Sequence, residues 1–195
     1  MAFERAIALT GGIAVGKSTV CSLLKLNGLR IIDADEISHR ILDESHEWVK
    51  EHFGSEFVDG SKVLRSSLGK LIFADASKKR ALEEYLHPKI KDAITKESIK
   101  QDKLGFAYII DIPLFFETKN YDIKESVVVY APKELQLARL MKRDGFSKEE
   151  ALGRIESQMD IEKKKALATW VIDNSKDLAH LQDECERFVD LLKSR

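Results

Sequence analysis

Short runs of apolar residues alternate with helical patterns along this chain of 195 residues. The runs are nearly continuous, which is typical of strands buried on both faces of a parallel sheet. Strands separated by helices in this way favour an α/β fold, a doubly wound sheet between two layers of helices. A last helix, near Leu178–Leu192, should pack on this sheet. Five runs predict its strands: Ala6–Leu9, Leu29–Ile32, Phe106–Ile110, Ser126–Tyr130 and Trp170–Ile172.

Two long segments interrupt this alternation. The first, from Asp35 to Lys103, contains no convincing strand, and its patterns predict several helices, with a long one near Lys78–Lys100. That is more chain than one crossover between neighbouring strands needs. We therefore interpret residues 35–104 as a helical insertion.

The second segment runs from residue 132 to residue 168. A helix is predicted over Lys133–Arg143, with Gly145 as the glycine that ends it. Ser147 followed by Glu150 forms the capping-box pattern of another helix start. The polar run Glu162–Lys165 is expected to be exposed to solvent. We interpret this helical segment, which is rich in arginine, as a movable lid.

The composition suits one compact domain, with 44% hydrophobic and 33% charged residues. A net charge of -1 gives no basic surplus for nucleic acid or an anionic membrane. No apolar run is long enough to span a bilayer, and the first strand begins close to Met1, which leaves no room for a signal peptide. Cys21 and Cys185 lie in apolar helical patterns outside any C-x-x-C pair, so two reduced, buried thiols are expected. These features predict a cytoplasmic protein, a monomer or a weak homo-oligomer.

The strongest chemical signal is a glycine-rich loop between the first strand and the helix that follows it. Glycines in such a loop let backbone N–H groups converge on a phosphate, and the helix start adds partial positive charge. Lys17 can reach the outer phosphates, and the Ser18 hydroxyl can bind Mg²⁺. The loop therefore predicts a nucleoside-triphosphate site. It fits the pattern G-x-x-x-x-G-K-S/T with Gly11, Gly12, Ile13, Ala14, Val15, Gly16, Lys17 and Ser18, followed by Thr19.

Carboxylates follow two other strands. Asp33 and Asp35 come directly after the second strand, and the carboxyl ends of parallel strands meet at one edge of the sheet. Asp33 could accept a proton from an attacking hydroxyl or hold Mg²⁺ through water. The alternative for Asp35 is an N-cap of a helix over Glu36–Leu42. Asp111 ends the third strand, where it would contact the Mg²⁺ shell; the alternative is a turn carboxylate beside Pro113.

Basic residues gather in the predicted lid. Arg139, Lys142 and Arg143 share one helical face by their spacing, and Arg154 follows on the next helix. Arginines that close over a transferred phosphoryl group stabilise its charge, and a lid keeps water out. The alternative is a solvated face on which Glu134 and Asp144 are local partners. After a phosphate-binding loop, we favour functional roles for Arg143 and Arg139.

A single histidine, His87, stands before Pro88 at the end of an apolar helical face. From its chemistry alone, a structural role is the simpler interpretation, because Pro88 restricts the backbone there.

An ordered set of motifs along essentially the whole chain resembles the dephospho-CoA kinases, the last enzymes of coenzyme A biosynthesis. A phosphate-binding loop alone is shared with many families, whereas the full set at these intervals is specific. The set consists of Ala8–Ile13 running into Gly16–Thr19, then Asp33–Asp35, Leu86–Pro88, Asp111–Glu117, Arg139–Asp144 and Asp173–Ser175.

The resemblance implies that ATP, with Mg²⁺, phosphorylates the 3′-hydroxyl of the ribose in dephospho-coenzyme A. It implies a three-layer α/β/α P-loop core with a five-stranded parallel sheet, as in nucleoside-monophosphate kinases. The core would comprise residues 1–34, 105–131 and 169–195. The insertion would be the coenzyme-binding subdomain, and residues 132–168 the lid.

The resemblance also implies roles for single residues. Asp33 would be the catalytic base, with Lys17 and Arg143 as its catalytic partners. Asp33, Asp35, His87 and Asp111 would contact the acceptor, and Ser18 and Asp111 would serve the metal. The ATP-binding set would be Gly12, Ile13, Ala14, Val15, Gly16, Lys17, Ser18, Thr19, Arg139, Arg143 and Asn174, the last with Asp173 near the adenine.

One departure and two alternatives remain at this point. The family loop often has Gly-Ser where this chain has Ala14-Val15, and the larger Val15 side chain could change loop rigidity or the approach of the acceptor.

Another nucleotide or small-molecule kinase would share the loop and the lid. A switch GTPase is disfavoured, because Asn174–Asp177 has the wrong order for the guanine motif N-K-x-D. The D-x-x-G match at Asp102–Gly105 precedes its strand instead of following it.

Overall fold

A five-stranded sheet forms the centre of the computed structural model, which describes residues 2–194. Its strand order is β2-β5-β1-β6-β7, and β1 pairs in parallel with β5 and β6, as β6 does with β7. The predicted parallel sheet is thus confirmed, with ends shifted by one or two residues. The strands are β1 (Ala6–Gly11), β2 (Ile31–Asp33), β5 (Tyr108–Asp111), β6 (Glu125–Tyr130) and β7 (Trp170–Asp173).

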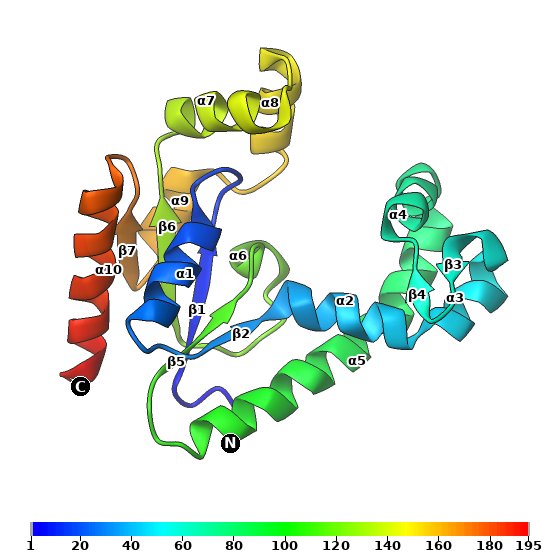
Figure 1. The fold of residues 1–195 in the computed structure, drawn as a ribbon, viewed down its shortest axis with the longest axis horizontal. Helices are drawn as coiled ribbons and strands as arrows, with labels where there is room; N and C mark the ends of the chain where they lie inside the picture. The colour runs from blue at the N-terminus through cyan, green and yellow to red at the C-terminus, as the bar shows by residue number, and fades with distance from the viewer. Residues whose placement is uncertain (1, 195) are drawn as a thin grey trace. The chain divides into compact units, whose positions relative to one another are not determined.

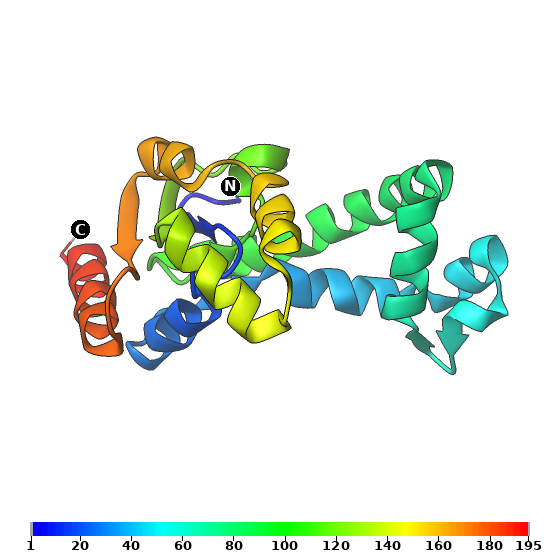
Figure 2. The same ribbon diagram turned by 90° about the horizontal axis from the view of Figure 1, so that it is seen from above.

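Helices cover both faces of this sheet, giving an α/β fold. Helices α1 and α10 pack beside each other on one face, and α6 and α9 lie on the other (Figures 1 and 2). Every residue of β1 and β5 is buried, as are the four inner residues of β6, which explains why these strands are largely apolar. The helices are α1 (Lys17–Leu26), α6 (Phe115–Thr118), α7 (Lys133–Asp144), α8 (Lys148–Glu156), α9 (Ile161–Leu167) and α10 (Leu178–Lys193).

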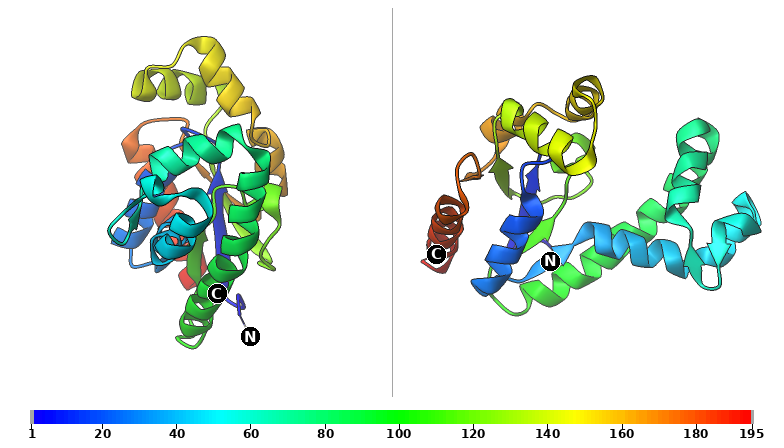
Figure 3. Two further views of the ribbon diagram at one scale, coloured as in Figure 1. Left: turned by 90° about the vertical axis from the view of Figure 1, so that its right-hand side faces the viewer. Right: turned by 45° about the horizontal axis from the view of Figure 1, so that its top comes forward.

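Helices α7 and α8 project beyond the carboxyl end of β6 (Figure 3). Helix α7 ends at Gly145, which has a φ of 71°, as the sequence predicted. The capping box of α8 is also confirmed, because Ser147 and Glu150 bond each other's backbone. Among residues 2–194, none of the helices combines the length and the apolar character needed to cross a bilayer.

The chain divides into two compact units. The first contains the sheet, up to Ile32 and from Ser98 onward, and the second is residues 33–97. The second unit has its own core, in which Trp48 stacks on Tyr85 with ring centroids 4.0 Å apart. Its elements are α2 (Ala34–Glu44), α3 (His46–Phe53), the short 3₁₀ helix η1 (Ser55–Phe57), β3 (Val58–Asp59), β4 (Lys62–Val63), α4 (Arg65–Ala74) and most of α5 (Ala76–Asp102).

Two expectations for this segment are wrong. Strands β3 and β4 form an antiparallel hairpin where no strand was predicted. Each strand has only two residues, too few for an apolar pattern, although Asp59-Gly60 is a common hairpin turn and Gly60 has a φ of 58°. Helix α2 begins earlier than predicted, and Asp33 caps it by accepting from the Glu36 amide at 2.9 Å. The alternative that Asp35 is the cap is therefore wrong.

Two expectations for buried and exposed residues also fail. Cys185 is buried as predicted, but Cys21 is only partly buried. The run Glu162–Lys165 is not uniformly exposed, because Lys164 is fully buried. Lys164 stands three residues after buried Ile161, so both side chains lie on the face of α9 that packs against the core. The helical position of Lys164 thus outweighs its polar character.

Candidate active site

The phosphate-binding loop joins the end of β1 to the start of α1. Gly16 has a φ of 89°, and a Cβ there would lie 2.2 Å from the Asn174 amide nitrogen, so only glycine fits. Ala14 also has a positive φ, of 58°. The first N–H groups of an α-helix have no partner within the helix, which makes this end suited to an anion, although the Thr19 N–H already donates to the Gly16 carbonyl at 3.0 Å.

Side chains from later in the sequence hold the loop from beneath. The Val15 carbonyl accepts from the Asn174 amide at 2.7 Å and from Arg139 at 3.5 Å. Because the C=O and N–H of one trans peptide point in opposite directions, the Gly16 N–H points away from Asn174. The Val15 side chain is buried in the core. The departure at Val15 therefore places no bulk on the open side of the loop.

Lys17 and Asp111 are brought together at the loop. The Lys17 ammonium lies 2.5 Å from one oxygen of the Asp111 carboxylate and 2.6 Å from the other. Their closeness follows from the sheet, in which Asp111 pairs with Leu9, two residues before the loop. The thiol of Cys21 lies 3.4 Å from the same carboxylate. The loop thus carries a cation whose partner is a buried side-chain carboxylate.

The oxygen groups at this point fit a magnesium ion that arrives with a triphosphate. Among residues 2–194, no group of three or more His, Cys, Asp or Glu side chains is placed to hold a metal. Mg²⁺ does not need such a cage, because it keeps several waters and uses one or two protein oxygens together with phosphates. The exposed Ser18 hydroxyl and the Asp111 carboxylate are hard oxygen donors of this kind.

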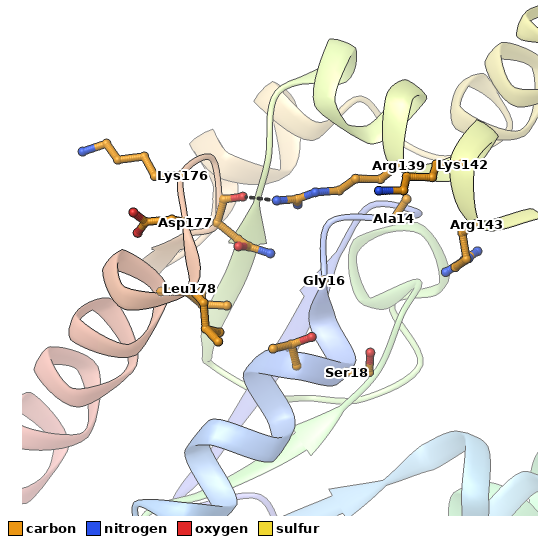
Figure 4. A pocket seen from close by; sticks show the side chains of 12 residues that line it. Ala14, Gly16, Ser18, Arg139, Lys142, Arg143, Lys176, Asp177 and Leu178 are labelled. Carbon is orange, nitrogen blue, oxygen red and sulfur yellow. Dashed lines mark hydrogen bonds between the residues drawn. The ribbon is translucent and has the colours of Figure 1, made fainter.

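A pocket of about 630 Å³ opens beside the loop and the start of α1 (Figure 4). Arg139, Lys142 and Arg143 reach it from α7, so the three cations predicted to share a face line one pocket. Arg139 donates to the Asn174 carbonyl at 3.0 Å, as the dashed line in Figure 4 marks. Lys176, Asp177 and Leu178, among others, form the facing wall.

The other predicted lid cations make local contacts. Arg143 is 61% exposed and forms two hydrogen bonds of 2.8 Å with Asp144. These bonds raise the pKa of Arg143 and lower the pKa of Asp144. The alternative partner, Asp144, is therefore real in this structure, although Arg143 still lines the pocket. Arg154 stacks over the Phe146 ring at 4.2 Å.

The loop after β7 is ordered by Asp173. Burial raises the pKa of its carboxyl, but hydrogen bonds from Ser175 and the nearby His180 together outweigh burial, so the pKa is lowered. Asn174 follows it and is buried, with its side chain on the loop at Val15. Asn174 therefore contacts the backbone of the phosphate-binding loop directly. Its predicted place near the adenine stays a prediction.

Three residues that support the loop escaped the sequence analysis. Gln136 is buried on α7 against Gly12, where an added Cβ would lie 2.7 Å from its side-chain oxygen, so a larger residue at position 12 would displace the Gln136 side chain. The Gln158 oxygen accepts from the Ile13 N–H at 2.9 Å, which turns that amide to a protein partner. Lys164 donates to the Gly11 carbonyl at 2.9 Å. Only Gln136 left a signal, as a polar residue four positions before buried Leu140 on one helical face.

The remaining predicted residues belong to the second unit. Asp33 ends β2 and caps α2, while Asp35 is exposed in the first turn of that helix. His87 is exposed on α5, which continues through Pro88. The roles of these three residues toward a substrate stay predictions.

Comparisons with known proteins show the family of this chain. The family model described as dephospho-CoA kinase matches residues 5–180. A dephospho-CoA kinase from Sulfurimonas denitrificans is 68% identical over 195 residues, covering 100% of this chain and 98% of that protein. One from Helicobacter pylori is 42% identical, covering 98% and 100%. The solved structure of a dephospho-CoA kinase from Campylobacter jejuni has a TM-score of 0.74 and 34% identity, covering 96% of this chain and 97% of its own. With a phosphate-binding loop, its supporting side chains and these matches along nearly its whole length, the chain belongs to the dephospho-CoA kinase family of enzymes.

Proposed function

We propose that this chain transfers the γ-phosphoryl group of ATP to the 3′-hydroxyl of the ribose in dephospho-coenzyme A. The products would be coenzyme A and ADP, the final step of coenzyme A biosynthesis. The observation that carries the proposal is the Lys17–Asp111 pair on a phosphate-binding loop, in a chain that matches this family over residues 5–180. Family membership favours this acceptor over that of another kinase with the same loop.

The ATP site would combine the loop with the pocket of about 630 Å³. The backbone N–H groups of residues 14–18 would bind the phosphates, because the Val15 carbonyl is held on the far side, and Thr19 would line the same pocket. Lys17 would leave Asp111 for the outer phosphates, because their charged oxygens form strong hydrogen bonds with its ammonium group. The flat Arg139 guanidinium and the apolar Leu178 suit the two sides of a nucleotide base.

Ser18 and Asp111 would hold Mg²⁺, which would supply positive charge to the phosphates. The oxygens of both side chains fit the ion, and the departure of Lys17 would expose the Asp111 carboxylate to it. The remaining steps depend on the side chains of this chain.

The transfer itself would form a bond between the ribose 3′-oxygen and the γ-phosphorus and break the bond from that phosphorus to the β–γ bridging oxygen. Asp33 would accept the proton of the 3′-hydroxyl. Charge spreads over the oxygens of the transferred group, and Arg143 would turn from Asp144 to stabilise it. Residues 132–168 would exclude water as a lid, and the insertion of residues 35–104, with Asp35 and His87, would bind the acceptor.

We also propose a cytoplasmic monomer or weak homo-oligomer that binds no nucleic acid, on the basis of a net charge near zero.

A coupled assay of ADP release, with Mg-ATP and a panel of acceptors, tests the main proposal. Dephospho-coenzyme A should be phosphorylated far faster than nucleoside monophosphates, shikimate or gluconate. Turnover of dephospho-coenzyme A at background, with strong turnover of another acceptor, would favour the alternative kinase. A preference for GTP over ATP with no acceptor turnover would return attention to the switch GTPase.

A further inference from the structure

A buried ammonium group lies directly beneath the phosphate-binding loop. Lys164 on α9 has no solvent exposure. Its Nζ donates to the Gly11 carbonyl at 2.9 Å and to the Pro113 carbonyl at 3.4 Å, and it lies 2.8 Å from the Glu117 carboxylate. Three acceptors therefore face the three N–H donors of one ammonium. Lys164 has no donor left for a ligand, in contrast to the lysine on the loop.

Such an arrangement is poorly explained by stability alone. Taking two charges out of water is expensive, and apolar residues of similar volume often give equal or greater stability than a buried ion pair. What the ion pair supplies here is direction, because each N–H fixes the position of one oxygen. Two of those oxygens are backbone carbonyls, one at the start of the loop and one in the segment that follows Asp111.

The same contact reaches the end of the lid segment. The Glu117 oxygen that pairs with Lys164 also accepts from the Met159 N–H at 3.1 Å. The preceding residue, Gln158, accepts from the Ile13 N–H at 2.9 Å. Two backbone groups of the loop, the Gly11 carbonyl and the Ile13 N–H, are thus held by residues 158–164. Both are turned to protein partners, and the N–H groups of Thr19 and Val20 donate to the Gly16 carbonyl, which leaves the N–H groups of residues 14–18 for an anion.

We propose that Lys164 is a positioning residue for the triphosphate, acting through the Gly11 carbonyl and through Glu117 without touching the substrate. This inference rests on the proposed function for the identity of the triphosphate. It predicts a specific loss: without the ammonium, the Gly11 carbonyl loses its partner and the first half of the loop can rotate. The loop then binds phosphates less well, whereas the base pocket and the acceptor site are unchanged.

The test compares Lys164→Met with Lys163→Met, a change of an exposed lysine one position earlier on the same helix. Binding of Mg-ATP and of inorganic tripolyphosphate is measured by calorimetry without acceptor, together with both KM values. Lys164→Met should weaken both ligands by the same factor, about tenfold or more, as expected when a supporting shell is removed. The KM for ATP should rise in parallel, and the KM for dephospho-coenzyme A should not change. Lys163→Met should behave as the unaltered chain.

A second variant guards against simple misfolding. Lys164→Met leaves the Glu117 charge without its cation. The double variant Lys164→Met with Glu117→Gln removes both charges and is therefore expected to unfold at a higher temperature than Lys164→Met alone. This double variant should still lose tripolyphosphate binding, because the Gly11 carbonyl remains without a donor. Normal tripolyphosphate binding in either folded variant overturns the proposal. So does an equal rise in the KM for ATP and the KM for dephospho-coenzyme A, or the failure of both variants to fold, because either result would make Lys164 only a structural residue.

The two proposals fail separately. If the unaltered chain binds tripolyphosphate but does not phosphorylate dephospho-coenzyme A, the proposed function is wrong, and the role of Lys164 is still measured by the binding experiment.

Discussion

The phosphate-binding loop has two faces, and each carries a lysine with a different task. On the open face, Lys17 is 21% exposed and contacts a single carboxylate, Asp111. On the underside, Lys164 is fully buried and contacts two backbone carbonyls and a carboxylate. The first cation can exchange one partner for a phosphate. The second has all its donors committed to the protein.

This difference gives a rule for telling side chains that can bind a ligand from side chains that support the loop. A buried side chain that satisfies backbone groups of the loop, such as Asn174 on the Val15 carbonyl, determines where the loop N–H groups point. A partly exposed side chain that contacts another side chain, such as Arg143 on Asp144, can move to a substrate. Loss of an open-face residue should therefore reduce turnover with little loss of stability. Loss of an underside residue should change both.

The largest effect is expected from Lys17→Ala, which removes the open-face cation. The kcat/KM for ATP should fall about 10⁴-fold, within the range that charged groups contribute at a transferred phosphoryl group. Steady-state kinetics measures this loss, and Lys25→Ala, in the last turn of the same helix, is the control. Turnover close to that of the control would break the comparison, because Lys17 would then serve only to pair Asp111.

Arg143→Ala should have the next largest effect, a fall in kcat on the order of 10³-fold if Arg143 acts as an arginine finger. The thermal unfolding temperature should hardly change, since Arg143 is an exposed residue. Asp144→Asn is the matched variant, because it weakens the two hydrogen bonds that hold Arg143 away from a substrate. That variant should keep or increase kcat. A large loss in Asp144→Asn would show that the pair itself is needed.

Asp33→Asn sharpens the comparison with a residue that has both kinds of role. Asparagine caps a helix as well as aspartate does, so α2 should keep its N-cap while the base is lost. The kcat should fall about 100-fold, with ATP binding unchanged. Asp33→Ala should lose about 1 kcal/mol of stability in addition, which chemical denaturation measures. Unchanged kcat in Asp33→Asn would mean that another group accepts the proton.

The open face of the loop was predictable from the sequence because its determinants are local. Gly16, Lys17 and Ser18 are adjacent in the chain, and Asp111 comes at the end of an apolar run that had to be a strand. Parallel strands then bring such ends to one edge of the sheet. The sequence thus predicted that Lys17 and Asp111 lie at the same edge of the sheet, and their direct contact follows from the strand order, in which β5 lies beside β1.

The underside was not predictable, because its contacts join distant segments. Gln158 and Lys164 meet the loop from about 150 positions away, and Lys164 stands in a run of three lysines whose composition indicates solvent. Only the packing of α9 on the sheet shows which of the three is buried. The error at Asp33 and Asp35 is different, since both are good capping residues and the exact start of α2 decided between them.

Asn174→Ala should give the smallest effect on turnover and the clearest sign of an underside residue. The buried Val15 carbonyl would keep only its 3.5 Å contact with Arg139, so we expect a loss of about 1–3 kcal/mol in the free energy of unfolding. The KM for ATP should rise roughly tenfold, because the Gly16 N–H is no longer held toward the open face. Asn174→Asp is the matched control: it keeps the size of the side chain, but its ionised oxygen cannot donate to a carbonyl, so it should be at least as damaging as alanine. Denaturation and ATP kinetics on the two variants decide the matter. If Asn174→Asp binds ATP normally, the hydrogen bond to Val15 does not orient the loop, and the distinction between the two faces fails at this residue.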